Sequence, residues 1–133
     1  MFILLNLGCP SDVIKLLATD QKRHFTSPLF PNFSPSYPKH CSWLITAPRD
    51  HVIVLRFLRF EIQFNNFCEN DHITVRDGAK SNSTILEKLC GIDQKCPITS
   101  SGRYMLIQYR TDKHGIRNAF KASYVALKQG THT

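Results

Sequence analysis

Apolar and polar residues alternate along several segments of this chain. Because successive side chains of a strand point to opposite faces, a period of two predicts strands with one buried face. Turn signals such as Pro48 and Asp77-Gly78 separate these segments, and together they predict an all-β fold, either an antiparallel sandwich or a barrel. Ile73 and Val75 are expected to point inward. In each of the other predicted strands one set of residues shares a face: Cys41, Trp43 and Ile45; Ile53, Leu55 and Phe57; Met105, Ile107 and Tyr109; and Phe120, Ala122, Tyr124 and Ala126.

The segment that runs from residue 51 to residue 67 also fits a helix, because the phenylalanines at positions 57, 60, 64 and 67 are spaced three, four and three apart. We favour a strand, since residues 52–54 are all β-branched and the alternation begins before the aromatic residues. The pattern then predicts a β-bulge after Phe57 that returns Phe60 and Ile62 to the core side.

Residues 1–23 lack this regular alternation. The stretch SDVIKLLATD, with Ser11 as a candidate N-cap, fits a short helix, so we expect an irregular or partly helical N-terminal segment. The apolar run from Phe2 to Leu7 is shorter than the ~7–15-residue core of a secretory signal and has no basic leader. We do not interpret it as a signal peptide. Either Met1 is not the natural secretory start, or the chain is a variant or fragment of a longer protein.

Composition indicates one globular domain. The chain has 133 residues, of which 42% are hydrophobic and 11% aromatic, and this is enough apolar surface for one core. No apolar run approaches the ~18 residues that a membrane-spanning helix needs. The formal net charge of +7 favours anionic partners, but the basic residues are scattered and the longest basic run is Lys22-Arg23, as on an ordinary solvated surface.

Catalytic and nucleic-acid functions find no support. The chain has no GxSxG or HExxH motif, no phosphate-binding glycine loop and no RNA-binding signature, so we expect a protein that is not an enzyme. Zinc is disfavoured, because the cysteines form no CxxC pair. Because the chain has five cysteines, an odd number, at least one thiol is free or joined to another chain if the protein is exported. The cysteines are Cys9, Cys41, Cys68, Cys90 and Cys96.

The order of several motifs resembles the CUB domain, an extracellular β-sandwich. SPLFPNFSPSYPKHCSWLI resembles the opening signature of that family, and VIVLRFLRFEI, CENDHITVRDG, LCG, ITSSGRYMLIQYRTD and AFKASY follow in the family's order. The resemblance implies an antiparallel two-sheet sandwich over residues 24–127, with an N-terminal segment 1–23 and a C-terminal tail 128–133. It also implies extracellular localisation.

The resemblance further implies two disulfides. Cys68 and Cys90 correspond to the second disulfide of the family. Cys41 corresponds to half of the first, and Cys9 is the one cysteine upstream of it, although its spacing departs from the family's pattern. The alternatives are a Cys9–Cys96 pair or a free Cys41. Cys96 is an addition to the family's pattern.

A calcium site is also implied by the resemblance. Many CUB domains hold one calcium ion through a glutamate and two aspartates, and here Asp71 and Asp112 match the aspartates while Gln63 stands where the glutamate is expected. In such relatives the acidic rim grips a lysine or arginine of a partner protein, so Asp71 and Asp112, with Tyr37 nearby, are the candidate binding residues. The alternative is that both aspartates only cap turns.

The expected function is that of a non-catalytic extracellular protein-interaction module, either secreted alone or forming one unit of a mosaic protein such as an ovochymase-type or tolloid-type protease. The alternative resembles the spermadhesins: a secreted protein that binds sulfated glycan or phospholipid through a basic surface. Asn32 and Asn82 lie in N-glycosylation sequons. The candidate basic residues are Arg49, Arg56, Arg59, Arg103, Arg110, Lys113, Arg117 and Lys121.

Overall fold

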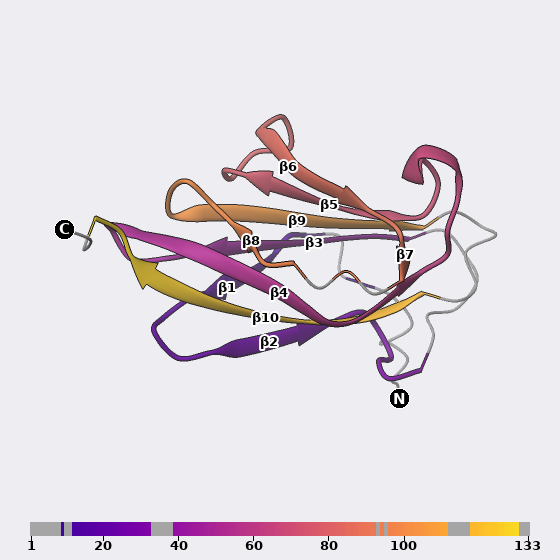
Figure 1. Ribbon diagram of the computed structural model, residues 1–133, viewed down its shortest axis with the longest axis horizontal. Coiled ribbons are helices and arrows are strands. Elements are labelled where there is room, and N and C mark those ends of the chain that lie inside the picture. Colours follow the sequence, from indigo (N-terminus) through magenta and orange to yellow (C-terminus); the bar gives the residue numbers. More distant parts are fainter. Residues whose placement is uncertain are drawn as a thin grey trace.

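The protein folds as two packed β-sheets (Figure 1). The structure is a computed structural model that describes residues 9, 12–32, 39–92, 94, 96–111 and 118–130. The first sheet has the order β1 (Ile14–Leu17), β3 (Lys39–Thr46), β9 (Tyr104–Thr111), β5 (His72–Asp77) and β6 (Thr84–Leu89). The second has the order β2 (Arg23–Thr26), β10 (Ala119–Lys128), β4 (His51–Ile62) and β7 (Gly91–Ile92), and β8 (Ile98–Thr99) pairs with another part of β4. The two-sheet sandwich is therefore confirmed.

The core follows the predicted alternation. Ile73 and Val75 are buried as expected, the residues named as sharing one face of each other strand are buried too, and Phe120 lies at the centre. The Phe120 ring makes edge-to-face contacts with four aromatic rings at centroid distances of 5.5–6.0 Å, a favourable geometry for aromatic pairs. Two of these rings belong to the first sheet and two to the second, so Phe120 joins the sheets. The four are Trp43 and Tyr109, and Phe25 and Phe57.

The predicted β-bulge in β4 is present. The register with β10 shifts so that Phe57 faces Ala122 whereas Arg59 faces Lys121, which leaves Leu58 as the extra residue. Phe60 and Ile62 return to the core, 6% and 1% exposed. The helical alternative for this segment is wrong, because Phe57 and Phe60 are buried on a strand while Phe64 and Phe67 lie outside the core.

The partly helical N-terminal segment is not found in the residues described from 12 onward. Residues 14–17 form β1, which pairs in parallel with β3, an exception to the antiparallel pairing we expected. Ile14 and Leu16 alternate with Lys15 and Leu17 and pack partly buried against the core, so burial on a sheet edge outweighs the weak local preference for helix. The sandwich thus includes residues upstream of the expected boundary at residue 24.

Both expected disulfides are present. Cys9 and Cys41 are joined with their Cα atoms 5.3 Å apart, and Cys68 and Cys90 with theirs 5.5 Å apart. The second bond ties the β4–β5 connection to the β6–β7 connection, so it fixes one end of the sandwich. Cys96 is a free, exposed cysteine.

Candidate functional site

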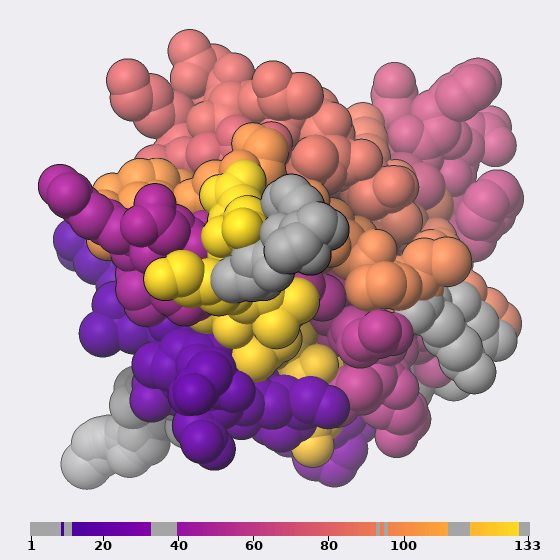
Figure 2. All heavy atoms as spheres, turned by 60° about the vertical axis from the view of Figure 1, so that its left-hand side comes forward, coloured from indigo at the N-terminus to yellow at the C-terminus, as the bar shows by residue number. Residues whose placement is uncertain are grey.

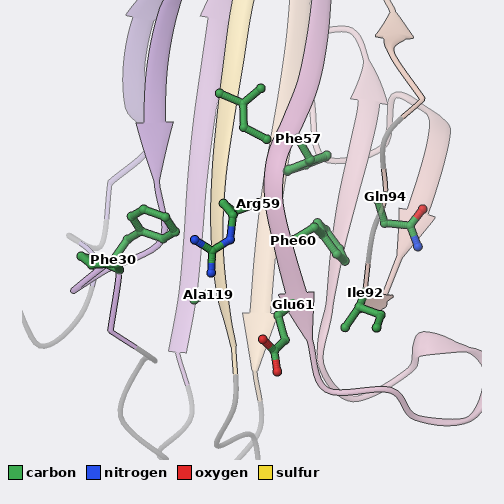
Figure 3. Close-up of a pocket in the computed structure, with 10 residues that line it drawn as sticks. Phe30, Phe57, Arg59, Phe60, Glu61, Ile92, Gln94 and Ala119 are labelled. Atoms are coloured by element: carbon green, nitrogen blue, oxygen red, sulfur yellow. The ribbon is translucent and has the colours of Figure 1, made fainter.

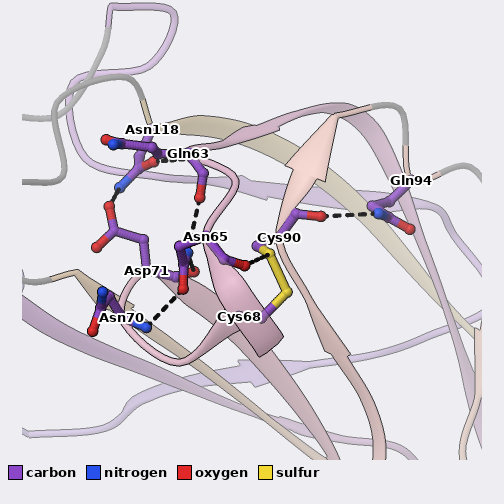
Figure 4. The surroundings of a disulfide bond; sticks show 8 residues. All are labelled: Gln63, Asn65, Cys68, Asn70, Asp71, Cys90, Gln94 and Asn118. Carbon is purple, nitrogen blue, oxygen red and sulfur yellow. Dashed lines mark hydrogen bonds between the residues drawn. A yellow bond between two sulfur atoms is a disulfide. The ribbon is translucent and has the colours of Figure 1, made fainter.

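The candidate site lies at the end of the sandwich where the β4–β5 connection meets the start of β10. Asp71 stands at the end of this connection and is 3% exposed. Its Oδ2 atom accepts a hydrogen bond of 2.9 Å from Nδ2 of Asn118, which is fully buried just before β10. The Oδ1 atom of Asn118 accepts a second bond, of 2.7 Å, from the backbone N–H of Gln63. Asn118 therefore links the end of β4 to the start of β5 (Figure 4).

Asn65 holds the connection in a closed shape. Its Nδ2 atom donates to the backbone oxygens of Gln63 and Asp71, each at 3.0 Å, and its Oδ1 atom accepts from the backbone N–H of Asn70 at 2.9 Å. The short 3-10 helix η2 (Asn66–Cys68) lies inside this loop, and the disulfide to Cys90 anchors it (Figure 4). The position of Asp71 is thus determined by hydrogen bonds and by a covalent link.

The charge balance around Asp71 matters, because a carboxylate removed from water must be paired, hydrogen-bonded or bound to a metal. Asn118 supplies a neutral donor. The neighbouring His72 has its pKa lowered, first by burial and then by the positive charges of Lys88 and Arg110. A backbone hydrogen bond at Cys68 acts in the opposite direction, and His40 adds a smaller lowering effect. His72 is therefore mostly neutral at neutral pH and adds little positive charge beside Asp71.

The predicted ligands are only partly placed. Asp112 and Tyr37 lie outside the described residues, so their relation to Asp71 stays a prediction. The side chain of Gln63 is exposed at the end of β4. Among the residues that the structure describes, no three histidine, cysteine, aspartate or glutamate side chains are grouped as a metal site.

The residues present still fit part of a calcium site. Calcium takes six to eight oxygen ligands and accepts carboxylates, amide oxygens and backbone carbonyls. Asp71 supplies a positioned, buried carboxylate, and the exposed amide of Gln63 is an oxygen donor on the same loop. The resemblance to the CUB family implies Asp112 as a further ligand, and this stays a prediction because Asp112 lies outside the described residues.

Two aromatic residues beside this site are exposed to solvent and were not among the candidate site residues expected from the sequence. Phe64 is 75% exposed and Phe67 is 86% exposed, both on the loop that ends at Asp71. Phe67 adopts a left-handed backbone conformation with φ of 58°. Exposed aromatic side chains are common anchors at protein interfaces. The sequence carries a signal for their exposure, since both residues follow the last inward position of β4, Ile62.

The structure separates the candidate basic residues. Arg56 and Arg59 on β4 and Lys121 on β10 lie on the outer face of the second sheet, whereas Arg110 lies on the first sheet. Arg103 donates to the backbone oxygen of Ala47 at 3.0 Å. Lys113 and Arg117 lie outside the described residues. The two sequon asparagines, Asn32 and Asn82, are both exposed, and their glycosylation stays a prediction.

The two packed sheets and the two disulfides define a disulfide-linked β-sandwich domain. The profile of the CUB domain matches residues 9–124, and the chain belongs to this family. The CUB module is a non-catalytic unit, and the homologous CUB proteins are extracellular. No helix in the described part of the chain is long and apolar enough to cross a membrane.

Three curated relatives share more than a third of their matched residues with this chain. Tolloid-like protein 1 of Mus musculus is 36% identical over 109 residues, which are 79% of this chain and 11% of that protein. Cubilin of Homo sapiens is 39% identical over 103 residues, which are 77% of this chain and 3% of that protein. Procollagen C-endopeptidase enhancer 1 of Homo sapiens is 39% identical over 105 residues, 76% of this chain and 23% of that protein. The chain thus spans a small part of each relative.

Solved structures agree with the fold. The MASP-1 CUB2 domain bound to Ca²⁺ superimposes with a TM-score of 0.69 at 26% identity, covering 83% of this chain and 96% of that one. The extracellular region of zebrafish Gpr126/Adgrg6 gives a TM-score of 0.73 at 27% identity, covering 88% of this chain and 15% of that one. A homologous CUB domain therefore binds calcium.

Proposed function

We propose that this chain is an extracellular protein-interaction module whose binding site is the rim formed by Asp71, Gln63 and Asp112, organised by a calcium ion. The observation that carries the proposal is the placement of Asp71. It is a buried carboxylate at the end of the sandwich, held by Asn118, on a loop that a disulfide anchors. The calcium-bound structure of the MASP-1 CUB2 domain supports calcium as the ion of this rim. The two disulfides support a location outside the cell, where conditions are oxidising.

The proposed ligand of the rim is a lysine or arginine side chain of a partner protein. A carboxylate held rigidly makes a stronger contact with a basic group than a mobile one does, because less conformational entropy is lost on binding. Phe64 and Phe67 lie on the same loop and would add apolar contacts around the charged one, as aromatic anchors do at interfaces. Tyr37 is a further candidate contact. Calcium, when bound, would neutralise the clustered acids and hold them in place.

Calcium titration followed by calorimetry tests whether the protein binds calcium. We expect wild-type protein to bind calcium, and Asp71→Asn to weaken binding by at least about tenfold because one charged ligand is lost. Glu87→Gln removes an exposed carboxylate of β6 and is the matched control, which should bind as wild type does. A calcium concentration of about 100 times the dissociation constant should also stabilise the fold by about 2.7 kcal/mol. Equal titrations of wild type and Asp71→Asn would overturn the proposal.

Retention on immobilised polylysine tests the recognition of a basic group. The formal net charge of +7 opposes general adhesion to a cationic resin, so retention must come from a local acidic site. We expect retention in calcium, release by chelator, and loss of retention in Phe67→Ser without loss of calcium binding. Retention that ignores the chelator would contradict the proposed mechanism.

A further inference from the structure

The connection between β1 and β2 contains the one place in the chain where two lysine or arginine residues are adjacent, Lys22 and Arg23. It leads from the edge of the first sheet to the edge of the second, and residues 20–24 are all exposed. Figure 1 shows this connection at the left-hand end of the sandwich. Figure 2 has that side turned forward and shows indigo N-terminal residues open at the surface. The basic pair is therefore accessible from outside.

Contacts on both sides fix the ends of this exposed stretch. Before the pair, the backbone oxygen of Thr19 accepts a hydrogen bond of 2.7 Å from the N–H of Ala126. After the pair, Phe25 is 8% exposed, and its ring centroid lies 5.0 Å from that of Trp43. Residues 20–24 are thus presented between two fixed points of the sandwich, and exposed connections of this kind are preferred sites of proteolytic cleavage.

The outer edge of β2 makes the stretch suitable for binding by a protease. β2 ends the order of the second sheet, and among the described residues β10 is its one strand partner, with Arg23 opposite Tyr124 and His24 opposite Ser123. An enzyme that binds its substrate as an extended strand can therefore pair with the other edge of β2. The first residues of β2 can also leave β10 at low cost, because strand ends at a sheet edge open locally without unfolding the core.

Comparison with other basic residues sets this pair apart. Arg59 of β4 and Lys121 of β10 lie in strands that have a neighbouring strand on both edges. Lys80 is exposed but lies in a closed turn, where its N–H donates to Oγ of Ser83 at 3.0 Å and its backbone oxygen accepts from the N–H of Ser83 at 2.9 Å. Of these residues, only Arg23 combines exposure, a position on an edge strand and a basic neighbour.

We propose that the peptide bond between Arg23 and His24 is a processing site for a serine protease that selects pairs of basic residues. Carboxylates in the two subsites before the cleaved bond would bind the Arg23 guanidinium and the Lys22 ammonium by charge-assisted hydrogen bonds. Arg23 loses little on binding, because the bond from its Nη1 atom to the backbone oxygen of Leu17 is long, at 3.4 Å, and exposed.

The reaction is hydrolysis of one amide. The serine oxygen of the protease attacks the carbonyl carbon of Arg23, the C–N bond to His24 breaks, and the leaving nitrogen takes a proton. Water then hydrolyses the acyl-enzyme. The products are a carboxylate on Arg23 and a free α-amino group on His24, and the reaction needs no oxidant and no cofactor.

The processed protein remains one folded unit made of two chains. The shorter chain keeps β1, which pairs with β3, and its Cys9 is bonded to Cys41 of the longer chain. In the longer chain, the segment after β2 is held by Phe30, whose ring centroid lies 5.9 Å from the guanidinium carbon of Arg59, within the range of cation–π contacts (Figure 3). Both sides of the cut are therefore anchored to the sandwich.

The processing site is independent of the proposed calcium rim. Thr19, just before the basic pair, bonds to Ala126 in the last part of β10, whereas Asn118 stands before the first residue of that strand. In Figure 1 the β1–β2 connection and the β4–β5 connection lie at opposite ends of the sandwich. The inference therefore does not rest on the proposed function.

Digestion of the purified, oxidised protein with a subtilisin-type protease selective for paired basic residues tests the inference. We expect one early cut, and N-terminal sequencing of the product should find a new chain that begins at His24. The product should run as one band without reductant and as two bands with it, because the Cys9–Cys41 bond joins the two chains. A peptide with the sequence of residues 18–28, digested in parallel, shows that the enzyme is active.

Variants identify the residues that the enzyme recognises. Lys22→Gln with Arg23→Gln should be cut at least about 100-fold more slowly, because a neutral side chain leaves the subsite carboxylates unpaired. Lys88→Gln with Arg110→Gln removes two exposed positive charges from the first sheet and is the matched control, which should be cut at the wild-type rate. Circular dichroism should show that both double variants are folded, since all four side chains are exposed.

Three results would overturn the inference. If the peptide is cut while the folded protein resists the same enzyme, the connection is closed to proteases. If the Lys22 and Arg23 double variant is cut as fast as the wild type, or if the first cut falls elsewhere, the basic pair is not the site. If the cut protein loses its cooperative thermal unfolding, the two chains do not remain one folded unit. A single cut before His24 that leaves a folded, disulfide-linked product supports the inference.

Discussion

Asn118 and Asp71 are 47 residues apart in the chain and joined by a hydrogen bond of 2.9 Å between Nδ2 and Oδ2. Both side chains are buried, at 0% and 3% exposure. The side-chain oxygen of Asn118 also accepts a hydrogen bond from the backbone N–H of Gln63. One neutral side chain thus supports the acidic residue around which the candidate site is built.

Replacing Asn118 by alanine should cost about 2–4 kcal/mol of unfolding free energy, because it leaves the buried carboxylate of Asp71 and the partly buried backbone N–H of Gln63 without this partner. Urea denaturation measures the loss. Asn82→Ala is the matched control, since Asn82 is exposed, and it should change stability by no more than about 0.5 kcal/mol. If Asn118→Ala leaves the unfolding free energy unchanged, groups other than Asn118 hold Asp71 in place.

Removing the Cys68–Cys90 disulfide should destabilise the fold by about 3 kcal/mol, because the bond closes a loop with a sequence separation of 22 and so restricts the unfolded chain. The variant is Cys68→Ala with Cys90→Ala, compared with wild type by denaturant unfolding. Cys96→Ser should be neutral, since Cys96 is exposed and free. Peptide mapping without reduction should find Cys96 as the single alkylated thiol. Alkylation of Cys9 or Cys41 in the native protein would contradict the pairing.

Gly78 should tolerate no side chain. Its φ is +143°, and a Cβ atom there would lie 2.5 Å from Oγ of Ser83, which also accepts the backbone N–H of Lys80. Gly78→Ala should therefore cost about 1–3 kcal/mol, measured by thermal unfolding. Gly102→Ala is the control, because a Cβ at that position meets nothing within 4 Å. Equal melting temperatures for the two variants would show that the Gly78 turn relaxes without cost.

Strand positions were predictable from the sequence because alternation is a local signal. Each inward residue of β4, from Ile53 to Phe57, is followed by an outward one, and burial on one face follows from the pleat itself. The bulge was predictable for the same reason, since the hydrophobic phase changes after Phe57. Strand β1 was not predicted, because its stability comes from parallel pairing with β3, a partner 29 residues away at Ile14 and Trp43.

The candidate site was only partly predictable. The resemblance to CUB domains indicated Asp71, but the role of Asn118 depends on the contact between the residue before β10 and the residue before β5, and no local pattern marks that contact. The exposure of Phe64 and Phe67 likewise depends on where β4 ends and how Asn65 closes the loop.

The sequence by itself determined the all-β class and the alternating faces of most strands, because a period of two is read along the chain. Its motifs also resemble one family, and that resemblance implied the two disulfides. The tertiary structure alone decided which distant groups meet: Asn118 with Asp71, and Arg59 with Lys121. Strand register is set by the packing of both sheets, and a shift of one residue would send each of these side chains to the opposite face.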